Sequence, residues 1–352
     1  MMQLALAALL ALPIPLPDST PPSHAQVLEI PPELRAQLHQ RVPGSVAPGA
    51  RRLELLVEFV FSADGLALEY GNSTTHTVAD AWRTRQVNCL SFALLFTGLA
   101  REVGLDAYVQ EIDQVLAWHQ QGGIVYNSSH VNVGVRFGQR RKTVDVSRAE
   151  VMARHRPEQV ADERALAHFY NNRGAELMAA GDSVAARRHM EEAIALDPRY
   201  ATSWNNLGVL RMRSDDAIGA EAAYREALAL DPTHASALFN IVGLFRRAGD
   251  EANAMHFQRR LERAQLADPF HQFLLGTQYE GRGEYERAVE HYRRAIRLHG
   301  DEHRFHFALA RTWLLMGERR RAGRALARAR ELGDDDSRAL YQAKLDRLRQ
   351  DR

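Results

Sequence analysis

The spacing of hydrophobic residues in the first half of the chain changes from helix-like to strand-like near residue 104. Before this point, apolar residues recur every three or four positions over residues 89–103, which is typical of one face of a helix. Asn88 is a favourable N-cap for this helix, and Gly104 is a favourable residue to end it. A second helix is predicted to start after Thr77, which is followed three residues later by Asp80.

After residue 104, β-branched and aromatic residues in partial alternation predict three strands. These strands are AYVQEI (107–112), HVNVGVRF (130–137) and KTVDV (142–146). Gly138 predicts a short hairpin turn between the last two. The apolar run LELLVEFVF (53–61) is compatible with either a helix or a strand. We therefore expect residues 26–150 to form an α+β domain, with a helix followed by an antiparallel sheet.

The second half of the chain is helical and repeats its small residues every 34 positions. One position of this frame holds Gly174, Gly208, Val242, Gly276 and Ala310. The position twelve residues later holds Ala186, Ala220, Ala254, Ala288 and Ala322. Small residues at both positions allow two antiparallel helices to approach closely. The larger residues Met190, Tyr224 and Tyr292 are then expected to fill the space beside them.

This pattern resembles the tetratricopeptide repeat. The resemblance covers about residues 167–336 and implies an all-α solenoid of about five repeats. Residues 337–352 are expected to form a capping helix that shields the last hydrophobic face, and residues 151–166 a linker or helix between the halves. A repeat array of this kind implies a protein partner bound on its concave face.

Composition and charge narrow the function classes. The chain has 352 residues, of which 45% are hydrophobic and 25% charged, as is ordinary for a globular protein. A formal net charge of +1 gives no electrostatic reason to expect a nucleic-acid partner. The Arg-rich run GERRRAGRALARAR (317–330) is expected to be a solvated helix face, because its Ala and Leu residues keep the repeat phase. Binding of an anionic partner is the alternative.

The N-terminus predicts export. Residues 4–16 form an apolar run that is too short to span a bilayer, and Ser23 and Ala25 are small residues before a possible cleavage site. Residues 1–25 are therefore predicted to be a signal peptide, and the protein to be periplasmic or extracellular. The alternative is a cytoplasmic protein, because this segment contains no Lys or Arg near its start. No later segment has the length and apolarity of a stable membrane span.

The chain contains one cysteine, Cys89, which excludes an intrachain disulfide and a multi-cysteine zinc site. Cys89 falls in the first turn of the predicted helix, where unpaired backbone N–H groups favour a thiolate. The same N–H groups can bind an oxyanion during acyl transfer. The alternative is an inert cysteine that only fills space in the core.

A nucleophilic thiol needs a base, and the base needs a group to orient it. His130 begins one predicted strand and Asp145 lies in the next, so the hairpin is expected to place the two side by side. Asp145 is also compatible with a solvated carboxylate on an edge strand. His130 and Asp145 supply two metal ligands at most, so no metal site is predicted. No phosphate-binding loop or other cofactor motif is evident.

This order of residues resembles the transglutaminase-like superfamily, a papain-like group with a Cys-His-Asp triad. The resemblance rests on the segments VNCLSFALLFTGLAREVGLDAYVQEI, HVNVGV and TVDVS, within residues 63–148. It implies Cys89 as nucleophile, His130 as general base and acid, and Asp145 as the orienting group. The implied function is thiol-dependent acyl transfer or hydrolysis on a protein or peptide amide. The alternative is a catalytically inactive scaffold that binds proteins through its repeats.

Overall fold

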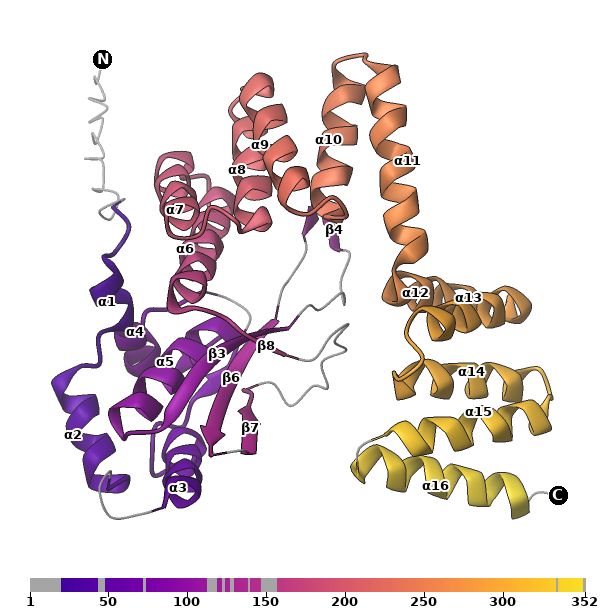
Figure 1. The fold of residues 1–352 in the computed structure, drawn as a ribbon, viewed down its shortest axis with the longest axis horizontal. Helices are drawn as coiled ribbons and strands as arrows, with labels where there is room; N and C mark the ends of the chain where they lie inside the picture. Colours follow the sequence, from indigo (N-terminus) through magenta and orange to yellow (C-terminus); the bar gives the residue numbers. More distant parts are fainter. Residues whose placement is uncertain are drawn as a thin grey trace, which may run out of the picture.

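The computed structural model describes residues 20–43, 48–71, 74–112, 119–121, 124–126, 130–138, 140–146, 157–333 and 335–350. Figure 1 shows two parts: a sheet with helices packed around it, and a curved array of paired helices that continues to the C-terminus. Most of the predicted signal peptide lies outside the described residues, so this assignment stays a prediction.

Helix α5 (Cys89–Glu102) lies at the centre of the N-terminal part. Its N-cap is Asn88, as predicted, and the Asn88 side chain accepts a hydrogen bond of 2.8 Å from the backbone N–H of Ser91. Gly104, with φ of +72°, follows its C-terminal end. Nearly every position from Leu90 to Ala100 is buried, so the helix must be covered on all sides.

Helices and strands from both halves of the chain provide this cover. The contacting helices are α1 (His24–Leu28), α3 (Gly49–Phe61), α4 (Val78–Thr84) and α6 (Asp162–Ala179). The ambiguous apolar run 53–61 lies within α3 and is therefore helical, and helix α2 (Pro32–Arg41) packs on α3. Thr77 caps α4 as predicted, since its side chain accepts a hydrogen bond from the backbone N–H of Asp80.

An antiparallel sheet packs against α5. Its strands are β3 (Asp106–Ile112), β6 (His130–Phe137), β7 (Arg140–Val144) and β8 (Glu158–Gln159), in the order β7-β6-β3-β8. Gly138 makes the turn between β6 and β7 with φ of +57°. Val131, Val133 and Val135 alternate along β6 and join the same hydrophobic core as α5. Strand β7 ends at Val144, so Asp145 lies just beyond the strand rather than within it.

The predicted linker, residues 151–166, contains more structure than expected. Within it, β8 pairs with β3 at the edge of the sheet, and α6 begins at Asp162. Residues Ala165, Phe169 and Tyr170 of α6 belong to the same hydrophobic core as α5. The first repeat is therefore joined to the N-terminal part by a shared core.

The sequence pattern did not predict two short pairs of strands. Strand β1 (Glu69–Tyr70) pairs in parallel with β2 (Gln86–Val87), immediately before α5. Strands β4 (His119–Gln121) and β5 (Ile124–Tyr126) pair antiparallel within the connection from β3 to β6. Strand β5 contacts helix α10 (Ala235–Arg247) of the repeat array, as Figure 1 shows for this hairpin.

The second half of the chain forms helix pairs that stack in sequence order, which confirms the predicted repeat architecture. The pairs are α6 with α7 (Ser183–Leu196), α8 (Ala201–Arg213) with α9 (Ala217–Leu230), α10 with α11 (Glu251–Ala267), α12 (Pro269–Gly281) with α13 (Tyr285–Leu298), and α14 (His303–Leu315) with α15 (Arg319–Leu332). The recurrence of glycine every 34 residues has a direct steric cause. A Cβ atom at Gly208 would lie 2.5 Å from the ring of Tyr224, and one at Gly276 would lie 2.6 Å from the ring of Tyr292.

Helix α16 (Asp335–Gln350) closes the array, as predicted for the C-terminal segment. Its residues Tyr341 and Leu345 are buried against Ala310, Leu326 and Ala329 of the last repeat. The cap removes the exposed apolar face that an unfinished solenoid would carry. Among the helices of the described residues, none combines the length and apolarity needed to cross a bilayer.

Candidate functional site

The candidate site lies where α5 and β6 both begin. Cys89 is the first residue of α5 and is partly exposed to solvent. His130 is the first residue of β6 and is buried, with 7% of its side chain exposed. Asp145 follows the last residue of β7. Three segments that are far apart in the sequence therefore bring the predicted site residues together.

His130 and Asp145 form a close pair. The Nε2 atom of His130 lies 2.7 Å from Oδ2 of Asp145, so this ring nitrogen donates to the carboxylate. The Nδ1 atom is then the ring nitrogen left for the thiol of Cys89. A carboxylate on one nitrogen fixes the tautomer and the ring orientation, as an orienting group must.

The environment of His130 favours its protonated form. Burial lowers the pKa of this imidazole, but hydrogen bonds to Asp145 and Cys89, together with their negative charges, outweigh burial and raise the pKa to about 9. The protonated ring donates to the carboxylate of Asp145 through Nε2. At neutral pH the ring of His130 is thus an imidazolium.

The register of the hairpin differs from the expected one in the residue of β6 that lies opposite Asp145. Val133 is paired with Val144, so continuation of the register places Asn132, not His130, directly opposite Asp145. The buried side chain of Asn132 donates from Nδ2 to Oδ2 of Asp145 at 3.3 Å. Asn132 and His130 are two residues apart and leave the same face of β6. Both therefore reach the same carboxylate.

Tyr70 is a further residue at this site. In the β1–β2 pair it lies opposite Val87, two residues before Cys89. Burial raises the pKa of the Tyr70 phenol, and the negative charges of Cys89 and Asp145 raise it further. The residue as a whole is 45% exposed. A two-residue strand pair leaves no periodic signal that would predict this contact.

The N-cap of α5 is held by a relay of hydrogen bonds from the repeat array. Asn88 donates from Nδ2 to the hydroxyl of Thr75 at 2.9 Å, and the backbone N–H of Thr75 donates to Oε1 of Glu176 at 2.8 Å. Glu176 belongs to α6 of the first repeat. The backbone N–H of His76 also donates to the buried hydroxyl of Ser91 at 2.7 Å. Together these bonds fix the turn that carries Cys89.

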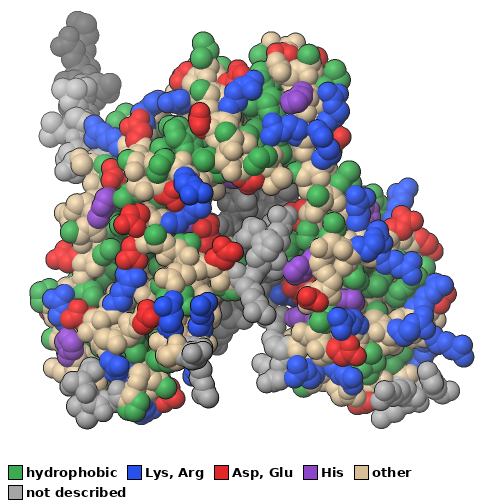
Figure 2. Space-filling model, in the orientation of Figure 1, with side chains coloured by type: hydrophobic (Ala, Val, Ile, Leu, Met, Phe, Trp, Pro, Cys, Tyr) green, Lys and Arg blue, Asp and Glu red, His purple; other side chains and the backbone are tan. Residues whose placement is uncertain are grey.

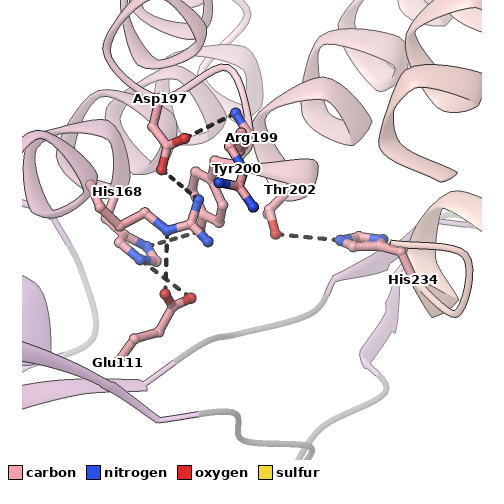
Figure 3. A network of polar contacts seen from close by, with 8 residues as sticks. Glu111, His168, Asp197, Arg199, Tyr200, Thr202 and His234 are labelled. Atoms are coloured by element: carbon pink, nitrogen blue, oxygen red, sulfur yellow. Dashed lines mark hydrogen bonds and ion pairs between the residues drawn. The ribbon is translucent and has the colours of Figure 1, made fainter. Parts of the chain in front are cut away.

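A second polar network joins the sheet to the repeats, as Figure 3 shows. Glu111 of β3 lies 3.3 Å from Nε of Arg164 and 3.5 Å from Nε2 of His168. Arg164 also pairs with Asp197 at 2.8 Å, and the hydroxyl of Tyr200 lies 2.8 Å from Nδ1 of His168. Burial raises the pKa of Glu111, but His168 and Arg164 outweigh burial and lower it to about 2. Glu111 precedes Ile112, which is paired with His130, so this network anchors the strand beside the site.

The first helices of the repeats carry a row of residues at 34-residue spacing. The row consists of Asn171, Asn205, Phe239, Phe273 and Phe307. Its asparagines join a ladder of side-chain hydrogen bonds: Asn206 donates to Asn171 at 2.9 Å, Asn205 to Asn206 at 3.1 Å, and Asn240 to Asn205 at 3.0 Å. The three phenylalanines are partly exposed and offer apolar surface on the later repeats.

Within the described residues, no group of three or more His, Cys, Asp or Glu side chains could hold a metal ion.

Comparison with known proteins concerns the helical half. Two family models described as tetratricopeptide repeat match residues 171–233 and 270–312. No curated protein matches the chain in sequence. Both matched ranges lie within the repeat array, so the resemblance of the N-terminal part to the transglutaminase-like superfamily stays a prediction.

Solved structures give a coarse likeness. A MamA protein is 20% identical and covers 50% of this chain and 95% of its own, with a TM-score of 0.27. YrrB, described as a TPR protein with an unusual peptide-binding site, is 17% identical and covers 51% and 92%, with a TM-score of 0.27. PilF of Pseudomonas aeruginosa is 19% identical and covers 53% and 94%, with a TM-score of 0.30. The helix pairs and the two family matches together identify the second half of this chain as an array of tetratricopeptide repeats.

Proposed function

We propose that the protein is a scaffold that binds a protein partner through its repeats. The observation that carries this proposal is the stack of helix pairs matched by tetratricopeptide-repeat models. Each repeat adds one first helix to a continuous surface, and such surfaces serve as extended binding faces in repeat proteins. The partly exposed side chains of Phe239 and Phe273 supply apolar anchors on that surface.

Photo-crosslinking tests this proposal. We would place p-benzoylphenylalanine, which keeps the phenyl ring and adds a benzoyl group to it, at Phe273 of α12, and at Ile218 of α9 as a control that is 87% exposed. The full chain should crosslink a discrete protein from position 273 and not from position 218, and excess unlabelled chain should compete. Equal crosslinking from both positions would contradict a specific surface on the first helices.

A second candidate function is favoured by the geometry at Cys89, His130 and Asp145. We propose that the thiolate attacks an amide carbonyl of the recruited partner, as implied by the resemblance to the transglutaminase-like superfamily. The sulfur forms a thioester, and His130 gives its proton to the departing amine. Water or a second amine then takes the acyl group and restores the thiol. Backbone N–H groups in the first turn of α5 can stabilise the oxyanion.

The single observation behind this candidate is the 2.7 Å contact between Nε2 of His130 and Oδ2 of Asp145, and Cys89 is among the groups that raise the pKa of this imidazole. Its test is alkylation by iodoacetamide, which labels one site because Cys89 is the only cysteine. An unperturbed thiol with a pKa of about 8.5 is almost entirely protonated at pH 6 and reacts slowly. The wild-type protein should react at pH 6 at least about tenfold faster than the His130→Gln variant.

Acyl transfer itself requires a second measurement. Incubation with glutamine-containing peptides, followed by intact-mass spectrometry, should reveal an acyl adduct that disappears in Cys89→Ala. Cys89 could be alkylated fast and still form no acyl adduct with any peptide or crosslinked partner. In that case the proposed function would be binding of a partner by the repeats alone. If wild type and His130→Gln were alkylated at the same rate, the proposed thiolate–imidazolium pair of Cys89 and His130 would be excluded.

A further inference from the structure

A buried asparagine lies beside the candidate site and takes no part in the proposed chemistry. Figure 2 shows acidic and basic side chains intermixed over the surface of the N-terminal part, at the left of the view. Asn132 is instead only 3% exposed, and it lies in β6, an inner strand of the sheet. Its neighbours Val131 and Val133 are the apolar, β-branched residues that a buried strand favours. An amide at this position therefore needs a reason other than packing.

The hydrogen bonds of the Asn132 amide are directed at one partner. Its Nδ2 donates to Oδ2 of Asp145 at 3.3 Å, whereas its buried Oδ1 has no hydrogen-bond partner among the described residues. Turning the amide over would place Oδ1 against a carboxylate oxygen, and both atoms are acceptors. A buried acceptor without a partner is unfavourable, and an apolar side chain at position 132 would avoid it. Stability alone thus gives no reason for asparagine here.

Asp145 lies at a place where the sheet gives its backbone little support. The pairing of β7 with β6 ends at Val144, which is paired with Val133, so Asp145 follows the last paired residue. Its side chain is 22% exposed. Asn132, by contrast, is fixed within the sheet, because it is paired with Gln110 of β3 on its other side. A donor on a fixed strand can hold a side chain that lies at a strand end.

Both donors reach the same oxygen of Asp145. Nε2 of His130 lies 2.7 Å from Oδ2, and Nδ2 of Asn132 lies 3.3 Å from the same atom. A rotation of the carboxylate away from either donor would lengthen both contacts. We propose that Asn132 is a positioning residue that holds the carboxylate of Asp145 toward the ring of His130. This proposal rests on the second candidate function, in which Asp145 orients the imidazole.

The titratable groups around His130 come from several elements. Cys89 begins α5, Asp145 follows β7, and Tyr70 lies in β1. Glu111 of β3 is one residue from the position paired with His130, but its carboxylate contacts α6 of the first repeat. Among these groups, the amide at position 132 is hydrogen-bonded to Asp145. A change at position 132 should therefore reach the imidazole through this carboxylate.

The pH dependence of stability tests the proposal, because it reports the pKa of His130 and needs no substrate. This pKa is about 9 in the folded protein and about 6.5 in an unfolded chain. Through this group, the unfolding equilibrium constant of the wild-type protein should rise about 100-fold between pH 6 and pH 9.5. Urea unfolding of the full chain measures this rise at the two pH values.

Two variants remove the donor, and a third is the matched control. Asn132→Leu keeps a side chain of similar size, and Asn132→Ala avoids any clash in case the leucine variant does not fold. Thr143→Val is the control, because Thr143 of β7 also donates a side-chain hydrogen bond of 3.3 Å within this sheet, to Gln110. Asn132→Leu is also combined with Asp145→Asn.

We expect the rise to be at least about tenfold smaller in both Asn132 variants than in wild type, and unchanged in Thr143→Val. In the double variant it should equal that of Asp145→Asn alone, because Asn132 acts through Asp145. A loss of stability that is equal at the two pH values would assign Asn132 a structural role only and overturn the proposal. A further reduction in the double variant would overturn it too. If the rise shrinks as expected and no acyl adduct forms on any peptide, the positioning role holds and acyl transfer alone fails.

Discussion

The backbone N–H of Thr75 donates a hydrogen bond of 2.8 Å to the carboxylate of Glu176, 101 residues later in the chain. Thr75 in turn accepts a hydrogen bond from Asn88, the N-cap of the helix that begins with Cys89. The first repeat therefore contacts the turn that carries the candidate nucleophile. A partner that moves or rigidifies α6 would act on this turn through two hydrogen bonds.

Replacement of Glu176 tests this relationship. Glu176→Ala leaves the N–H of Thr75, a buried residue, without its acceptor, which costs about 1–3 kcal/mol of unfolding free energy. Because the turn loosens, alkylation of Cys89 at pH 6 should slow by about threefold or more. Glu176→Gln keeps an acceptor oxygen at the same place and should restore most of the rate. If the Gln and Ala variants react equally slowly, the hydrogen bond to Thr75 does not position the turn.

The raised pKa of His130 predicts how stability depends on pH. An unfolded histidine has a pKa of about 6.5, whereas the folded value is about 9, so the folded protein binds the proton more tightly. The resulting stability is fully present below pH 6.5 and is lost as the pH rises through 9. One pKa unit corresponds to about 1.4 kcal/mol, so the loss is up to about 3 kcal/mol.

Urea unfolding of wild type and Asp145→Asn at pH 6 and pH 9.5 measures this loss. The Asn variant removes the main group that raises the pKa of His130. Its unfolding free energy should therefore fall less than that of wild type between the two pH values. Parallel pH dependence in the two proteins would mean that His130 and Asp145 do not form a charged pair in solution.

The parts of the site that the sequence predicted are those that depend on neighbours in the chain. Asn88 and Cys89 lie on one helical turn, so their positions follow from helix rules. His130 and Asp145 flank one hairpin with its turn at Gly138, so their proximity follows from strand pairing. The exact register did not follow, because it is fixed at the turn, where Phe137 pairs with Arg140, and this pairing puts Asn132 opposite Asp145.

The contacts that the sequence could not predict join segments without a shared periodicity. A two-residue parallel pair places Tyr70 opposite Val87, two residues before Cys89. Glu176 and Glu111 act across the boundary between the sheet and the repeats. In the sequence each is an ordinary acidic residue, because its partner depends on how the two halves pack. The repeats were predictable for the opposite reason, since four of the five 34-residue units keep Gly or Ala at the same frame position.

Glu111 predicts a loss of stability in acid. A free glutamate has a pKa near 4.5, and the folded value is about 2, so the folded state keeps the carboxylate charged at lower pH. The stability that Glu111 contributes is present above pH 4.5 and is lost as the pH falls toward 2, up to about 3 kcal/mol. Glu111→Gln should flatten the decline of unfolding free energy over this range. Asp162→Asn is the control, because it breaks an ion pair with Arg101 in which both side chains are at least 42% exposed. This variant should change the decline of unfolding free energy by less than about 1 kcal/mol. Equal effects of the two variants would contradict a special role for the Glu111 network.

The close approach of paired helices predicts opposite effects of one substitution at two glycines. Alanine at Gly208 would place its Cβ 2.5 Å from the ring of Tyr224, so the second repeat must open, at a cost of about 1–3 kcal/mol. Alanine at Gly243, within α10, meets nothing within 4 Å and has the higher helix propensity, so it should stabilise by about 0.5–1 kcal/mol. Urea unfolding of Gly208→Ala and Gly243→Ala, followed by circular dichroism at 222 nm, measures both. Stabilisation by Gly208→Ala would show that Tyr224 can leave its place at no cost, and the steric reason for the 34-residue period would then fail.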